Sequence, residues 1–146
     1  MAMRLSRGFT LIELMIVVSI IAIIVAIALP NMIRARVISN EASAINNIRA
    51  FISAEAAFYG SANKYTGTIT DLTGASPPFL NGTWAGIKSG FTYALGGTDM
   101  NYTVIATPAV FGQTGNRGFF CDGSGVIREE FGAVATVAST PITQHN

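Results

Sequence analysis

The chain has 146 residues, enough for one small domain beside a long helix. Its formal charge is +1 and it has no basic stripe, so nucleic acid is not expected as the main ligand. Only 12% of its residues are charged, against about 25% in a typical soluble domain, which favours a subunit that buries surface against copies of itself. The single cysteine, Cys121, excludes an intrachain disulfide and is expected to be a buried structural thiol.

The first predicted element is a membrane-spanning helix at about residues 14–33. These twenty residues carry no formal charge, and as a helix they span roughly 30 Å, the thickness of the hydrocarbon core of a bilayer. Their Leu, Ile and Val side chains favour insertion by about 3 to 6 kcal/mol in total. A carboxylate costs only about 2.5 to 3.5 kcal/mol even at mid-membrane, so Glu13 at the edge of the segment does not prevent insertion. Arg4 and Arg7 precede the segment and basic residues also follow it, so charge alone does not set its orientation.

The apolar segment is directly preceded by a short motif, Gly-Phe-Thr-Leu-Ile-Glu-Leu at residues 8–14, whose last residue begins the segment. Pro30 lies inside the segment near its end. The block resembles the N-terminus of a type IV prepilin, the family that includes pilus subunits and the pseudopilins of type II secretion. The resemblance implies a leader at residues 1–8, cleaved after Gly8 by a membrane prepilin peptidase. It also implies N-methylation of the new amine on Phe9. Subunits of this kind polymerise through their apolar helices.

Glu13 is the strongest functional candidate, because an ionisable side chain that borders a membrane span needs a partner. Cleavage after Gly8 places a cationic amine on Phe9 one helical turn away, and the amine of a neighbouring subunit can come equally close. The family resemblance implies this pairing between subunits. In the alternative interpretation Glu13 only favours the positive start of a helix, an effect worth about 0.3 to 1 kcal/mol.

One long helix is expected from residue 9 to about residue 59. Pro30 lies inside it and is expected to bend the axis, because proline removes a backbone hydrogen bond. Beyond the proline, apolar residues at helical spacing predict an amphipathic face that packs on a sheet. The residues assigned to that face are Val37, Ile38, Ile45, Ile48, Ile52, Phe58 and Tyr59.

The remaining residues, 60–146, are expected to form a small globular domain. Residues 60–89 lack periodicity and predict a long loop, with Trp84 as an anchor onto the domain. Glycine-rich turns separate four predicted strands, which favours an antiparallel meander. These strands are Phe91–Leu95, Tyr102–Thr107, Gly118–Cys121 and Gly125–Arg128, and residues 132–146 are expected to add an edge strand or an extended tail. The fold class is therefore α+β, type IV pilin-like, with the long helix packed on a small antiparallel sheet.

No enzyme chemistry, cofactor or metal is expected. The only histidine, His145, has no cysteine or acid near it in sequence, which disfavours the usual nucleophile–base pairs. Residues 122–125, Asp-Gly-Ser-Gly, lack the further carboxylates of a calcium loop and indicate a hairpin turn. Glu129 and Glu130 are interpreted as the solvated end of a strand.

The predicted function is that of a structural subunit of a type IV pilus-like filament, either a homopolymer or a mixed pilin filament. The chain is expected in the bacterial inner membrane, single-pass with its C-terminal domain outside the cytoplasm, and then in an extracellular pilus. Its other partners would be the prepilin peptidase/methyltransferase and the assembly machinery. The first alternative is a pseudopilin of a type II secretion system in a periplasmic pseudopilus. The others are a membrane-anchored binding domain that does not polymerise, and a secreted domain released near Leu29 after the Ala-Ile-Ala sequence at residues 26–28.

Overall fold

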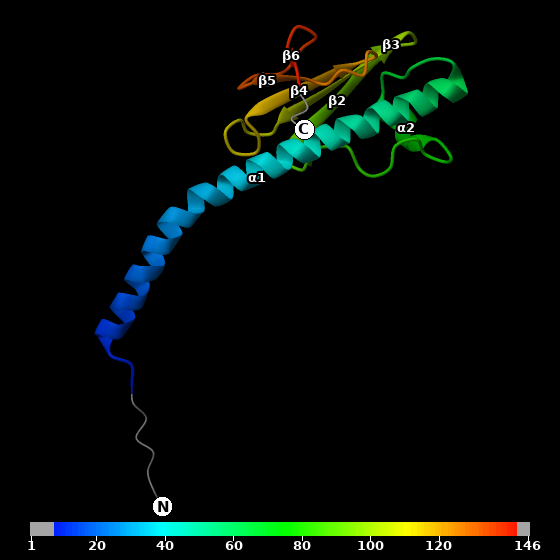
Figure 1. The fold of residues 1–146 in the computed structure, drawn as a ribbon. Coiled ribbons are helices and arrows are strands. Elements are labelled where there is room, and N and C mark those ends of the chain that lie inside the picture. The colour runs from blue at the N-terminus through cyan, green and yellow to red at the C-terminus, as the bar shows by residue number, and fades with distance from the viewer. Residues whose placement is uncertain (1–7, 143–146) are drawn as a thin grey trace, which may run out of the picture. The chain divides into compact units, whose positions relative to one another are not determined.

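The computed structural model of the protein describes residues 8–142, so the predictions on Arg4, Arg7 and His145 lie outside the described residues. A long helix and a six-stranded antiparallel sheet make up most of it, and the predicted α+β class is confirmed (Figure 1). The elements are α1 (Leu11–Ala62), α2 (Ile69–Gly74), β1 (Ile87–Lys88), β2 (Phe91–Thr98), β3 (Asn101–Pro108), β4 (Arg117–Asp122), β5 (Arg128–Phe131) and β6 (Thr140–Pro141).

The chain divides after Ala35 into two compact units. In the described part of the first unit, α1 exposes its apolar side chains on all sides. The second unit begins at Arg36 and contains the rest of α1, together with α2 and the whole sheet. Among the described residues the hydrophobic core lies entirely in the second unit, so the burial of apolar side chains stabilises the fold there.

The core of the second unit lies between one face of α1 and the sheet. Ala44, Ile48 and Phe51 are fully buried at helical spacing. The predicted face differs from the observed one, because Ile38 is exposed whereas Glu41 is buried. Ala44 and Ala54 are also buried on the packed face, so large apolar side chains alone do not identify that face. The buried sheet residues of the core are Phe91, Tyr93, Tyr102, Val104, Ala106, Phe119 and Cys121.

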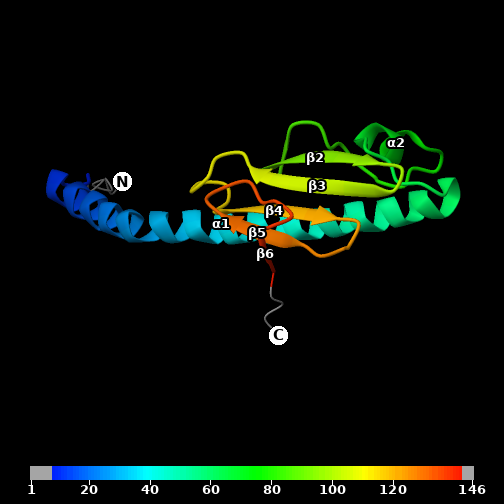
Figure 2. The same cartoon turned by 90° about the horizontal axis from the view of Figure 1, so that it is seen from above.

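The strands follow one another in chain order from β1 to β6, each antiparallel to the next (Figure 2). The β2–β3 hairpin pairs Thr98 with Asn101 across a turn that contains Asp99 and Met100. Residues 102, 104, 106 and 108 of β3 are all buried, which is the alternation of a strand with one face on a core. The two-residue strands β1 and β6 form the edges of the sheet.

The fourth predicted strand was placed too early in the chain. Residues 125–127 lie outside any strand and β5 spans Arg128–Phe131, because the turn after β4 continues through Gly125 at a φ of 73°. Glu129 and Glu130 therefore lie within β5 rather than beyond a strand, paired with Phe119 and Gly118. The predicted loop at residues 60–89 also contains α2 and β1, which no local pattern indicated.

Trp84 anchors the segment between α2 and β1, as predicted. Its ring centroid lies 4.5 Å from that of Phe51 and 5.5 Å from that of Tyr93. The indole N–H donates to the carbonyl of Asn81 at 3.0 Å, and Lys88 Nζ lies 3.6 Å from the centroid of the indole ring. The tryptophan is thus held by two edge-to-face aromatic contacts, a hydrogen bond and a cation–π interaction.

An ionic network joins α1 to the sheet. Glu41 on α1 is only 5% exposed, and its Oε1 accepts the backbone N–H groups of Asn116 and Arg117 at 2.7 and 3.1 Å. Its Oε2 accepts Nε and Nη2 of Arg117 at 2.9 and 2.7 Å. Arg117 Nη1 donates to Glu129 on β5 at 2.6 Å. One buried carboxylate on the helix therefore has four donors from the sheet side, a charge-assisted arrangement with bidentate geometry.

Candidate functional site

The start of α1 is built as a capping box. Thr10 precedes the first helical residue and its backbone N–H donates to Glu13 Oε2 at 2.9 Å. The Thr10 hydroxyl donates to the same oxygen at 2.7 Å, and the Glu13 N–H lies 3.3 Å from Thr10 Oγ1. This reciprocal pattern satisfies backbone donors that a helix start leaves without partners. Glu13 therefore has a role within its own chain as well as a charge that faces outward.

Sequence reasoning missed Thr10, although the signal was present. A threonine followed three residues later by a glutamate, directly before an apolar run, is the sequence pattern of a capping box. The interpretation of Glu13 as a helix-start residue thus has geometric support in the single chain. Within residues 8–142 the second carboxylate oxygen, Oε1, accepts no hydrogen bond, so it is available to a donor from another molecule.

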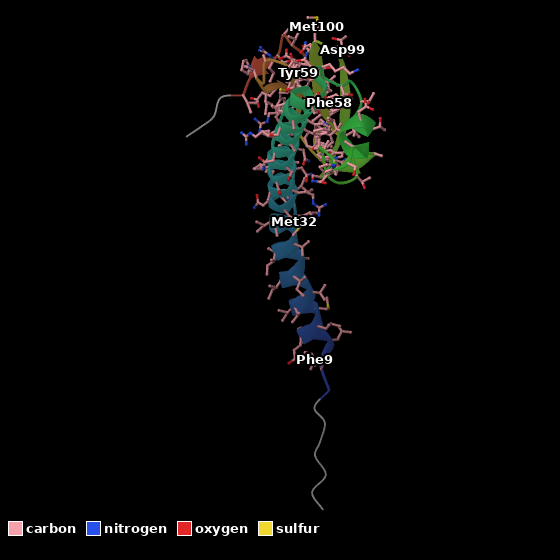
Figure 3. The ribbon with its side chains drawn as sticks, turned by 90° about the vertical axis from the view of Figure 1, so that its right-hand side faces the viewer. Phe9, Met32, Phe58, Tyr59, Asp99 and Met100 are labelled. Atoms are coloured by element: carbon pink, nitrogen blue, oxygen red, sulfur yellow. The ribbon has the colours of Figure 1, made fainter. Side chains whose placement is uncertain are left out.

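Gly8 and Phe9 lie just before this capped start, and both are exposed. Phe9 is 86% exposed, and Figure 3 shows it at the start of the helical segment. A Cβ added to Gly8 would meet no atom of the chain within 4 Å. The two residues that flank this peptide bond are therefore both open to solvent in the described part of the chain.

The two polar side chains of the apolar segment donate hydrogen bonds to backbone carbonyls of the same helix. Ser19 Oγ donates to the carbonyl of Met15 at 2.8 Å, and Asn31 Nδ2 to that of Ile27 at 3.4 Å. Such internal pairing is what a helix needs in lipid, where no water is available. Pro30 lies within α1 and the helix continues through it, while the bend expected there stays a prediction. Among the described residues, α1 is the one helix long and apolar enough to cross a membrane.

A second carboxylate of α1, Glu55, is fully buried in the domain. Its Oε2 accepts the Thr66 N–H at 3.1 Å, whereas its Oε1 has no hydrogen-bond partner among the described residues. Burial raises the pKa of the Glu55 carboxyl above 4.5, against the opposing effect of the Thr66 hydrogen bond, and the charge of Asp71 raises it further. The folded chain therefore binds the Glu55 proton more tightly than the unfolded chain does.

We expect Glu55→Gln to change how the stability of the domain depends on pH. Glu55 favours folding fully below its ordinary pKa of 4.5, and this contribution is lost as the pH rises through the higher folded pKa. The glutamine keeps an acceptor for Thr66 but does not titrate, so the variant should gain stability relative to the wild type as the pH rises above 4.5. Urea unfolding of the full chain in detergent, followed by circular dichroism, measures this difference. A difference that does not change with pH would contradict the assignment.

Cys121 and Asp122 serve the structure of the sheet. Cys121 is fully buried, as predicted, and burial raises the pKa of its thiol to about 11. A thiol in that state is a poor nucleophile at neutral pH. Asp122 Oδ1 accepts the Ser124 N–H at 2.9 Å, which is the hydrogen bond of an ordinary Asx turn.

These features define a class of protein in which a long apolar helix that can cross a membrane continues into a small helix-and-sheet domain. Comparison with known families matches residues 3–29 to the prokaryotic N-terminal methylation motif. The prediction of a prepilin N-terminus is confirmed: this chain carries that motif, and its exposed Gly8–Phe9 bond and its Glu13 lie inside the matched residues.

Two relatives are similar over the N-terminal part of the chain. The type IV major pilin protein PilA of Myxococcus xanthus is 46% identical over 61 residues, 42% of this chain and 28% of that protein. PilA4 of Thermus thermophilus, a type IV wide pilus major component, is 54% identical over 39 residues, 27% of this chain and 30% of that protein. The matched part of this chain thus spans less than a third of the length of either relative.

Proposed function

We propose that the chain is a structural subunit of a type IV pilus-like filament, assembled from the inner membrane through the apolar part of α1. The observation that carries this proposal is the uniform exposure of large apolar side chains along residues 11–33. A helix that is apolar all round has to be buried in lipid or in other protein. The segment is buried in lipid before assembly, and it is buried among the helices of neighbouring subunits in the filament.

The membrane stage requires a single-pass orientation with the domain from Arg36 onward outside the cytoplasm. A prepilin peptidase on the cytoplasmic side then cleaves after Gly8, and the new amine of Phe9 is methylated. The methylation motif matched at residues 3–29 supports these steps. The similarity to two major pilins favours a pilus subunit over the type II secretion alternative.

In the filament, Glu13 pairs with the Phe9 amine of a neighbouring subunit. Oε1 of Glu13 supports this pairing, since it accepts no hydrogen bond from residues 8–142 whereas Oε2 accepts two from Thr10. In a bundle of apolar helices the effective dielectric constant is low, so a misplaced charge is costly and a paired one fixes the register of the subunits.

Shearing filaments from the surface of native cells, followed by intact-mass measurement, tests the function. We expect a chain that begins at Phe9 and is one methyl group heavier than its sequence. A chain absent from surface filaments, but present in membranes of cells that carry them, would overturn the proposal. A mature chain that begins near Leu29 would instead indicate a secreted domain.

We expect Gly8→Leu to block leader removal without affecting the fold. No atom of residues 8–142 lies within 4 Å of a Cβ at this position, so we expect any effect of the substitution to arise in the peptidase rather than in the fold. The peptidase must seat the backbone closely, which only glycine permits. Mass measurement of membrane-bound chains should show the uncleaved form in large excess. Gly60→Leu, at another exposed glycine with open space around its Cβ, serves as the matched control and should be processed normally.

A further inference from the structure

The β3–β4 loop, residues 109–116, holds apolar side chains outward on a well-fixed backbone. Val110 is 47% and Phe111 36% exposed. The Thr114 hydroxyl accepts the Val110 N–H at 3.0 Å, and Gly112 N–H donates to the Gly115 carbonyl at 2.9 Å. These hydrogen bonds within the loop fix its backbone, so Val110 and Phe111 are held at defined positions.

The same loop is fixed to α1 close to the end of the apolar segment. Asn40 Nδ2 donates to the carbonyl of Thr114 at 2.9 Å. Gly90 lies under this contact, and a Cβ there would come within 2.6 Å of Asn40 Nδ2 and 3.0 Å of Thr114 Cβ. The backbone of three segments therefore meets at Asn40, and the loop has little freedom to move away from the helix.

Chain length alone places Asn40 near the membrane surface. Ile33, the last residue of the apolar segment, is seven residues earlier, which is about 10 Å along a helix and at most about 25 Å in any conformation. The headgroup layer on each side of a bilayer is about 5 to 8 Å thick. A loop hydrogen-bonded to Asn40 is thus within reach of the headgroups when the apolar segment spans the membrane.

The chemistry of the loop suits that place. Its eight residues, Ala-Val-Phe-Gly-Gln-Thr-Gly-Asn, carry no charge, and the charge of the next residue, Arg117, is paired with Glu41 and Glu129. The exposed cation nearest in the helix sequence is Arg36, which an anionic lipid surface attracts. Exposed apolar side chains on an uncharged loop are stabilised when they enter the headgroup boundary.

We propose that the β3–β4 loop is a membrane-surface contact that rests Val110 and Phe111 among lipid headgroups before the subunit is assembled. This inference rests on the proposed function, because it requires the apolar segment to span a bilayer. The contact would keep the domain lying against the membrane and would be released when the subunit enters a filament. The contact partner is the lipid surface itself, with no other protein needed.

Spin labels on the full chain, reconstituted at low density into vesicles of phosphatidylethanolamine and phosphatidylglycerol, test the contact. Single substitutions Val110→Cys, Met100→Cys and Ile24→Cys supply the sites, and the unsubstituted chain shows any labelling of buried Cys121. Met100, 90% exposed in the β2–β3 turn, is the matched control. The eight residues of β3 separate it from the loop by roughly 27 Å along the strand. Collision with dissolved oxygen and with a water-soluble nickel complex reports the depth of each label.

We expect the label at position 110 to collide with nickel several-fold less than the label at position 100, and Phe111→Ser in the Val110→Cys chain to reduce that protection. Equal nickel collision at positions 110 and 100, with a protected label at position 24, would overturn the loop contact and leave the proposed function intact. A nickel-accessible label at position 24 would overturn both, because the segment would not be in the bilayer. Protection at position 110 that disappears when the protein is diluted further in lipid would assign the surface to a second copy of the chain, and would likewise overturn the lipid contact.

Discussion

Glu13→Gln is expected to abolish filament assembly while the chain stays in the membrane with its helix start intact. Glutamine can take the place of glutamate in a capping box, so the Thr10 N–H keeps an acceptor. The substitution removes only the charge and leaves the Phe9 amine of a neighbouring subunit unpaired. Breaking a buried ion pair costs about 3 to 5 kcal/mol. At about 1.4 kcal/mol per factor of ten, each contact loses more than a hundredfold in its association constant.

The measurement is a count of sheared surface filaments beside the amount of mature chain in the membrane. Glu13→Ala should lose assembly equally, although it also loses the cap. Thr10→Ala is the matched control, because it removes the capping hydroxyl and keeps the charge at a cost of about 0.5 to 2 kcal/mol in the helix start. This control should still assemble. If Glu13→Gln gives normal filaments and Thr10→Ala does not, the role of Glu13 is that of a helix cap.

Arg117→Met is expected to destabilise the domain by about 3 kcal/mol, the lower end of the cost of breaking a buried ion pair, since Arg117 itself is partly exposed. Glu41 would stay buried with only two backbone donors for its charge. Methionine preserves most of the length of the apolar stem, so the loss reports the charge rather than a cavity. Urea unfolding of the full chain in detergent measures the free energy of unfolding.

The matched comparison is Glu129→Gln, which removes the second, more exposed partner of Arg117. This change should cost no more than about 1 kcal/mol, the value typical of surface ion pairs. The double variant Glu41→Gln with Arg117→Met should recover part of the lost stability, because no unpaired buried charge is left. Equal losses for Arg117→Met and Glu129→Gln would show that the burial of Glu41 does not govern the energetics of the network.

Local patterns predicted the long helix and the β2, β3 and β4 strands, because apolar spacing and glycine-rich turns are signals that involve only residues close together in sequence. The short helix α2 was not predictable, since its six residues are held by the burial of Leu72 against distant parts of the chain. The packed face of α1 was misassigned because Glu41 and Glu55 occupy it, and glutamates are ordinarily placed on the solvent side.

The candidate site divides in the same way. Gly8, Phe9 and Glu13 lie within six residues of one another, so one short motif indicates all three, and Thr10 could have been found from the capping-box spacing. The Glu41–Arg117 pair spans 76 positions in sequence and has no local signature. Only the packing of α1 against the sheet brings these two residues together.

The uniform apolar surface of residues 14–33 has a consequence for reversibility. Lipid tails are as apolar as leucine. A helix that moves from the bilayer into a bundle of similar helices therefore stays in an apolar environment and gains no hydrophobic free energy. The hydrophobic effect on this segment therefore favours neither the bilayer nor the helix bundle. The balance then depends on close packing of the helices, on Glu13 and on contacts between domains. In the filament proposed above, the apolar segment itself would therefore favour neither growth nor retraction, and withdrawn subunits could return to the membrane.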